Sequence, residues 1–157
     1  MRRLPIAAVI FLALSAASPV AAQNPTRCIT PRDACAFFDG YLSAFNRRDW
    51  DAFRATLADD ITVMFDSPTA TERRDGRVAV EEAFRQVFPP PGREPGQLPP
   101  PLRPENLLAQ DFGDFVVVSF HLRAPEEVAR RTVMLHRSAA GWRVVHIHAS
   151  SFGLSSR

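Results

Sequence analysis

The stretch that decides the fold is residues 141–151, GWRVVHIHASS, which is the longest alternating run in the sequence. Successive side chains of a β-strand point to opposite faces of a sheet, so the alternation sorts this stretch into two rows. One row is small and apolar, which suits a concave interior. The other is mixed and carries two imidazoles, which suits a half-wet surface or a subunit interface. The first row is Val145, Ile147 and Ala149, and the second is Trp142, Val144, His146, His148 and Ser150.

Further strands precede this one and are joined to it by short turns. Apolar runs predict strands at 106–112, 115–123 and 128–137, and the Gly-Asp pair at 113–114 is a tight hairpin signal. An earlier run at 61–65 also reads as a strand. The second half of the chain therefore predicts an antiparallel meander.

The first half of the chain predicts three helices. Thr30 as a hydroxyl cap and Pro31 at the first helical position are typical of a helix start. Apolar residues then recur at spacings of three and four as far as Phe45. Asp49 is predicted to cap a shorter helix, and Gly76 to begin a third. Helices first and strands last predict an α+β fold, in which a strongly curved antiparallel sheet carries the three helices on its concave face.

A proline-rich segment separates the last predicted helix from the meander. Residues 89–104 hold eight of the fourteen prolines. Proline lacks a backbone N–H and fits neither a helix interior nor a central strand, so we expect an extended surface loop. A semi-rigid connector is favoured over a docking site for a partner.

The first residues are typical of an export signal. A positive start, an apolar run and small residues at 20–22 predict that 1–22 is a cleaved signal peptide, followed by a tail at 23–34. A permanent N-terminal anchor is the alternative, although the apolar run is too short to span a bilayer. We expect an exported protein, periplasmic or extracellular, with no stable membrane insertion after cleavage. A disulfide between Cys28 and Cys35 would then contribute about 2.5 kcal/mol of stability.

Length and charge limit the classes of function. The chain has 157 residues, which suits one domain with a single core. Its formal net charge of +2 comes from Arg2 and Arg3, since the rest holds 17 arginines against 17 acids. A nearly neutral chain without a basic stripe gives nucleic-acid binding no electrostatic support. We therefore expect no nucleic-acid partner.

Three short motifs follow one another along the chain: YLSAFNRRD at 41–49, LADDITV at 57–63 and DGR at 75–77. Together they resemble the helices and first strand of the nuclear transport factor 2-like superfamily, which includes SnoaL-like domains and ketosteroid isomerase. The C-terminal part also resembles the association domain of calcium/calmodulin-dependent protein kinase II. The resemblance covers about 35–153, with 89–104 as an insertion. The matching C-terminal residues are His136-Arg137, Trp142, Val145-His146, His148 and Ser150.

The resemblance has three implications for the architecture. It implies a cone-shaped pocket between a bent sheet and the helices. It implies a homodimer, commonly formed through the outer face of the sheet. It also implies that Val145, Ile147, Ala149 and Ser151 face the pocket, while His146 and His148 face outward.

Tyr41 is the only tyrosine, and the resemblance places it where ketosteroid isomerase has its oxyanion-hole tyrosine. The position of that enzyme's base falls on Phe65, with Asp66 one residue further on, and the position of its protonated acid falls on Val133. Because two of the three parts are missing, isomerase chemistry in that form is disfavoured. The alternative for Tyr41 is a core tyrosine with a satisfied hydroxyl.

His121 shares a row with Phe115, Val117, Ser119 and Arg123 in the strand at 115–123. The resemblance implies that this row faces the pocket, where an imidazole could act as a general base or as a hydrogen-bonded wall residue. Hydrophobicity alone would bury the opposite row instead: Val116, Val118, Phe120 and Leu122.

Arg131 shares a face with Val133 and Leu135, which form the inward row of the penultimate strand. Arg131 and Arg123 are candidate forks for a carboxylate. The alternative is that both lie solvated at the pocket rim. The histidines of the last hairpin have a spacing that can ligate zinc or copper, but no nearby acid is evident, so we expect no metal and no cofactor.

These observations favour an exported domain that binds a small amphipathic or anionic molecule, with Tyr41, His121, Arg123 and Arg131 as ligand-binding residues. The first alternative is an isomerase, dehydratase or cyclase that uses Asp66 or His121 as base and Tyr41 as donor. The second is a non-catalytic, dimeric interaction module whose pocket is filled by side chains.

Overall fold

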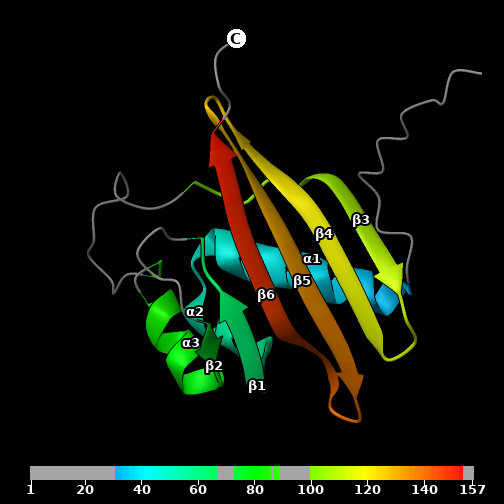
Figure 1. The fold of residues 1–157 in the computed structure, drawn as a ribbon. Coiled ribbons are helices and arrows are strands. Elements are labelled where there is room, and N and C mark those ends of the chain that lie inside the picture. The colour runs from blue at the N-terminus through cyan, green and yellow to red at the C-terminus, as the bar shows by residue number, and fades with distance from the viewer. Residues whose placement is uncertain (1–30, 67–72, 86, 89–99, 154–157) are drawn as a thin grey trace, which may run out of the picture.

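The computed structural model describes residues 31–66, 73–85, 87–88 and 100–153. Within these residues the chain forms three α-helices and six β-strands (Figure 1). In chain order they are α1 (Arg32–Arg47), α2 (Trp50–Ala55), β1 (Leu57–Met64), β2 (Arg74–Asp75), α3 (Arg77–Phe84), β3 (Glu105–Asp111), β4 (Phe115–Ala124), β5 (Glu127–Ser138) and β6 (Gly141–Gly153).

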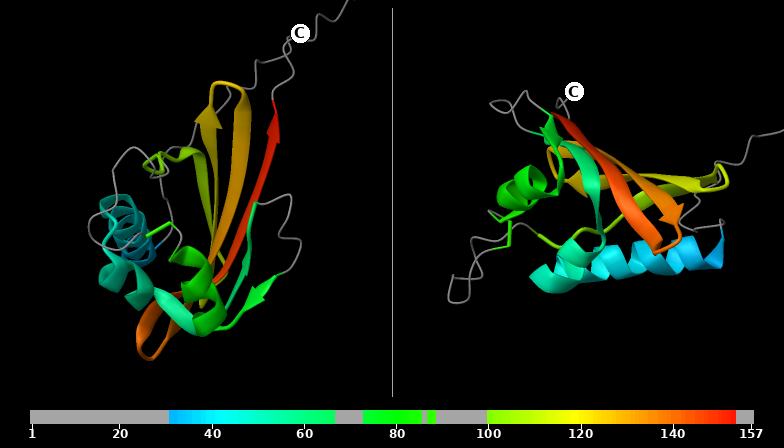
Figure 2. Two further views of the ribbon diagram at one scale, coloured as in Figure 1. Left: turned by 90° about the vertical axis from the view of Figure 1, so that its left-hand side faces the viewer. Right: turned by 90° about the horizontal axis from the view of Figure 1, so that it is seen from below.

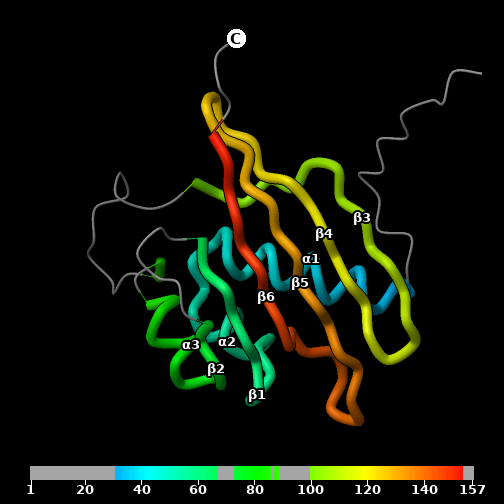
Figure 3. The backbone as a smooth tube through the Cα atoms, in the orientation of Figure 1, coloured from blue at the N-terminus to red at the C-terminus, as the bar shows by residue number. Residues whose placement is uncertain are grey.

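The six strands form one sheet in the order β2-β1-β6-β5-β4-β3. Strands β3 to β6 are antiparallel neighbours joined in sequence, which confirms the predicted meander (Figure 3). The sheet as a whole is mixed, because β1 lies parallel to β6. The short β2 pairs with β1 at the edge of the sheet.

The helices cover one side of the curved sheet, as the turned views in Figure 2 show. This confirms the predicted α+β fold with helices on the concave face. Phe53 of α2 is completely buried and lies at the centre of the core. Its ring centroid lies 4.7–5.7 Å from those of four other aromatic rings: Tyr41, Phe45, Phe84 and Phe88.

The helix starts follow local chemistry. Helix α1 begins after Pro31, which provides no side-chain cap, and the predicted cap Thr30 lies outside the described residues. The Asp49 side chain accepts a hydrogen bond of 3.0 Å from the Ala52 N–H, which confirms the predicted cap of α2. Gly76 precedes α3 with a φ of 81°, a backbone conformation that favours glycine.

A β-bulge interrupts β6. Leu135 of β5 pairs with Val144, and the preceding Met134 pairs with His146, so Val145 is one residue more than β5 can match. Such an extra residue bends a strand and shifts the alternation of its side chains. The alternation of inward and outward side chains therefore shifts by one residue between the two halves of β6.

Because of the bulge, the predicted rows of the last strand are wrong as far as Val145. Trp142 and Val144, predicted to face outward, lie in the core and are 6% and 0% exposed. The indole N–H of Trp142 donates to Asp33 at the start of α1 over 3.0 Å. Val145, predicted to face inward, lines a surface hollow with His136 and Arg143. Beyond the bulge the predicted faces are right, because Ile147 is buried and His148 is exposed.

Several predictions concern residues outside the described ranges. The signal peptide, Cys28 of the predicted disulfide and residues 89–99 of the proline-rich segment fall there, so export and the Cys28–Cys35 bridge stay predictions. Residues 100–104 follow as irregular chain, as expected. In the described part, no helix is both long and apolar enough to cross a membrane.

Candidate functional site

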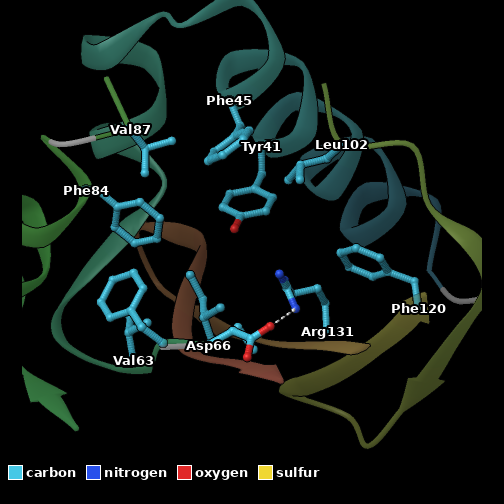
Figure 4. A pocket seen from close by; sticks show the side chains of 12 residues that line it. Tyr41, Phe45, Val63, Asp66, Phe84, Val87, Leu102, Phe120 and Arg131 are labelled. Atoms are coloured by element: carbon cyan, nitrogen blue, oxygen red, sulfur yellow. Dashed lines mark ion pairs between the residues drawn. The ribbon is translucent and has the colours of Figure 1, made fainter. Parts of the chain in front are cut away.

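A cavity of about 230 Å³ lies between the helices and the concave face of the sheet (Figure 4). Its wall is mostly aromatic and aliphatic, and its polar side chains are Tyr41, Asp66 and Arg131. These three come from α1, from the end of β1 and from β5, respectively. The apolar wall consists of Phe45, Val63, Phe65, Phe84, Val87, Leu102, Phe120, Ile147 and Ala149.

Arg131 provides the positive charge of the cavity. It lies on the inner row of β5, two residues before the buried Val133. Its Nη1 donates to the carbonyl of Arg130 over 2.8 Å and to the carbonyl of Ser150 over 3.2 Å. Burial lowers the pKa of the guanidinium, and the negative charges of Asp66 and Glu127 oppose that effect.

Asp66 follows β1 and faces Arg131. Its Oδ2 lies 3.8 Å from Arg131 Nη1, and the two side chains are 27% and 22% exposed, respectively. The carboxylate therefore lies at the rim, where water reaches both groups. Both hydrogen bonds and the ion pair of Arg131 use Nη1, so Nε and Nη2 have no protein acceptor among the described residues.

Tyr41 points its hydroxyl into the same cavity. The residue is 4% exposed, and its ring lies between Phe38 and Phe53 at centroid distances of 5.9 and 5.5 Å. Figure 4 shows the hydroxyl and the Arg131 guanidinium pointing toward one another. Burial raises the pKa of Tyr41 strongly, although the charge of Arg131 acts in the opposite direction. In the described part of the chain this neutral hydroxyl has no hydrogen-bond partner.

The predicted orientation of the His121 row is wrong. Phe120 pairs with Arg131 and lines the cavity, so His121 lies on the outer face of the sheet. There its Nδ1 is 3.4 Å from the side-chain nitrogen of Asn106. Hydrophobic burial decides this orientation, because the opposite row of β4 carries the bulky apolar side chains. His121 is therefore no base for this cavity.

Arg123 is also absent from this group. Its Nε lies 3.3 Å from the Glu105 carboxylate, an ion pair in which both side chains are about half exposed. It borders a neighbouring hollow instead. Of the five residues predicted for the site, the structure brings together Tyr41, Asp66 and Arg131.

One wall residue, Leu102, has no signal in the sequence. It lies near the end of the proline-rich segment, 56 residues beyond its partner Asn46. The Asn46 side chain donates to the Leu102 carbonyl over 3.0 Å and accepts from the Leu102 N–H over 2.7 Å. A residue that merely ends the apolar stripe of α1 thus fixes the wall of the cavity.

The described histidines make other contacts. The Nδ1 of His146 lies 2.6 Å from the Thr62 hydroxyl, and the ring of His136 stacks on Phe115 at 4.5 Å. Across the described ranges, no group of three or more His, Cys, Asp or Glu side chains is placed to hold a metal ion.

Comparison with known proteins gives a family and a set of similar structures. The SnoaL-like domain family matches residues 35–154. Comparison with curated proteins gives no match.

Three solved structures illustrate the structural likeness, and at their sequence identities it shows the fold alone. An NTF2-like protein of unknown function from Pseudomonas putida KT2440 has 21% identity and a TM-score of 0.60, over 76% of this chain and 84% of that one. A provisionally assigned dehydratase of the NTF2-like family from Streptomyces avermitilis has 13% identity and a TM-score of 0.61, over 77% and 94%. The S. rosetta CaMKII hub has 20% identity and a TM-score of 0.60, over 80% and 99%.

Proposed function

Because the chain belongs to the SnoaL-like domain family, we propose that it binds a small, largely apolar molecule with one anionic or carbonyl group in the cavity between α1 and the sheet. The mature protein would do so outside the cytoplasm, after removal of residues 1–22. The wall would bury the apolar body of the ligand, and the polar side chains would orient its head.

The observation that carries this proposal is the unfilled hydrogen-bonding capacity of Arg131. A guanidinium has five N–H donors in a fixed fork, and it costs free energy to bury them without acceptors. Nε and Nη2 lack acceptors in the described residues, while the Tyr41 hydroxyl points toward the same space. A carboxylate or carbonyl oxygen placed between them would accept from both.

Two probes of equal chain length test the proposal. Hexanoate and 1-hexanol differ only in the head group, and isothermal titration calorimetry measures both. We expect hexanoate to bind more tightly, and Arg131→Met to weaken hexanoate by about ten- to a hundredfold, the range for a hydrogen bond to a charged group. Equal affinity of the two probes for the unaltered protein would overturn the proposal.

Arg130→Met is the matched control. Arg130 is the neighbour of Arg131 in β5 but points to the other face, where its guanidinium stacks on Phe152 at 4.7 Å. The Arg130→Met substitution removes the same charge one residue away and should leave hexanoate binding nearly unchanged. An equal loss in both variants would indicate a general effect of net charge.

A second candidate function is proton transfer, because Asp66 and Tyr41 line one cavity. An isomerase, dehydratase or cyclase needs a base and a donor on the same substrate. Deuterium exchange at the α-carbon of cyclohexanone, followed by NMR, tests this function without a known substrate. Asp66→Asn should abolish the exchange if Asp66 is the base. If the unaltered protein gives no exchange above the rate in buffer, proton transfer is refuted and the binding function alone stands.

We also propose that the outer face of the sheet supports a homodimer, either of the binding protein or of a non-catalytic interaction module. The predicted contacts Trp142 and Val144 are in the core, so other side chains would form the interface. Met64, Leu108 and Phe115, on β1, β3 and β4, are 41–43% exposed and are apolar side chains that a partner could cover. Met64→Asp should give monomers in sedimentation velocity at micromolar concentration, and a monomeric unaltered protein would refute the dimer.

A further inference from the structure

A second cavity, of about 380 Å³, adjoins the first along the inner face of the sheet. Its floor includes Leu122 and Ala129, which pair with each other across β4 and β5. Each lies two residues along its strand from Phe120 and Arg131, the pair under the first cavity. Side chains two apart on a strand share a face, so the two cavities are neighbours on one surface.

Leu102 lies at the boundary between the two cavities, because it lines both. In Figure 4, Leu102 and Phe120 lie on the side of the cavity away from Phe84. The two hydrogen bonds with Asn46 fix the backbone of Leu102, so the boundary has a defined position. One residue therefore borders both the space with an unfilled guanidinium and a second, mostly apolar space.

We propose that the second cavity is a subsite for the apolar tail of the ligand whose head binds Arg131. This inference rests on the proposed function and deepens it: the ligand class is an elongated, unbranched monocarboxylate. The head lies between Arg131 and Tyr41, and the chain passes Leu102 onto Leu122 and Ala129.

Size supports an extended ligand. Pockets for small molecules usually enclose ~300–1,000 Å³. The first cavity, at about 230 Å³, is smaller than that range, whereas the two cavities together fall within it. A ligand confined to the first cavity would be unusually small for a site with this much aromatic wall.

Charge fixes the direction in which the ligand lies. The charged residues of the second cavity include both signs, and Arg123 already pairs with Glu105 at 3.3 Å. Glu127 adds a carboxylate there, which would repel an anionic head. Arg103 also lines the second cavity, but it is exposed, so water can satisfy its donors. The unfilled donors of the half-buried Arg131 lie in the first cavity, so the carboxylate lies there and the tail in the second.

The test compares hexanoate with dodecanoate by titration calorimetry, using the full mature protein. We expect dodecanoate to bind at least about tenfold more tightly, because its additional methylenes are buried beyond Leu102. Ala129→Phe fills the second cavity and should remove this advantage while leaving hexanoate affinity unchanged. Since Ala129 is nearly buried and a larger side chain there could disturb folding, Ala124→Trp at the exposed end of the same cavity is a second blocking variant.

Each outcome decides between the two proposals. If hexanoate binds and dodecanoate binds no more tightly, the tail subsite is refuted and the proposed function stands. If dodecanoate keeps its advantage in both blocking variants, its tail lies elsewhere and the subsite is also refuted. If neither probe binds the unaltered protein, the proposed function fails and the subsite fails with it.

Discussion

The carboxylate of Asp66 lies 3.8 Å from the guanidinium of Arg131, at the rim of a cavity whose wall is otherwise almost wholly apolar. Because both groups are partly exposed, water screens the pair, and such pairs stabilise a fold by less than about 1 kcal/mol. The relationship matters more for binding, because Asp66 offers Arg131 the same type of group as an anionic ligand would.

Asp66→Asn should therefore strengthen hexanoate binding several-fold while changing the free energy of unfolding by less than about 1 kcal/mol. Titration calorimetry measures the first effect and urea unfolding the second. Asn keeps the shape of the side chain and removes its charge, so the change isolates the electrostatic competition. Weaker hexanoate binding would mean that Asp66 orients Arg131 instead of competing for it.

Tyr41 should resist ionisation for as long as the protein is folded. Folding raises its pKa through burial, so the stabilisation is fully present below the unfolded pKa of about 10 and is lost as the pH rises above it. Tyr41 is the only tyrosine, so the change in near-ultraviolet absorbance that accompanies phenol ionisation reports it alone, since the two tryptophans absorb there but do not ionise. We expect tyrosinate to appear together with the loss of circular dichroism, while the urea-unfolded chain ionises near pH 10. Tyrosinate at pH 10 in a chain with intact dichroism would place the hydroxyl in water.

His146 should make the fold less stable in mild acid. Burial, followed by the charges of His148 and Arg73, lowers its pKa below the ordinary value of 6.5. The unfolded chain then binds the proton more readily, so this stabilisation is present above about pH 6.5 and is lost as the pH falls through the folded pKa. Urea unfolding from pH 7.5 to 5 should show a shallower decline for His146→Gln than for the unaltered protein. Parallel curves would assign the decline to other groups.

Phe53 should be among the most sensitive positions of the core. Phe53→Ala removes a completely buried ring that packs against five other aromatic rings, and such truncations cost about 3–5 kcal/mol. Phe112 is 63% exposed, so Phe112→Ala is the matched control and should cost less than about 0.5 kcal/mol. Similar costs for the two changes, measured by urea unfolding, would contradict the assigned core.

The order of the elements could be predicted because it depends on local patterns. The apolar spacing before Phe45, the cap at Asp49 and the turn at Gly113 each act within a few residues. The inward position of Arg131 also followed from alternation, since β5 pairs with β6 without interruption through that region. These features need no knowledge of distant parts of the chain.

The position of His121 and the wall at Leu102 depend on contacts between distant parts of the chain, which a local pattern does not contain. The outward position of His121 depends on the opposite row of β4, Val116, Val118 and Phe120, which is buried in the core, and the resemblance does not hold for this strand. The contact between Asn46 and Leu102 joins residues 56 positions apart, across a proline-rich segment without periodicity. Neither residue type indicates such a pairing in advance.

The bulge at Val145 changes the curvature of β6 without changing the face on which the other side chains lie. Without Val145, Val144 would still lie opposite Leu135 and His146 opposite Met134, so every other side chain would keep its face. The bend that the additional residue introduces would be lost, and a sheet with less curvature encloses less space. The volume available to a ligand can therefore change through the length of this strand, independently of the side chains that contact the ligand.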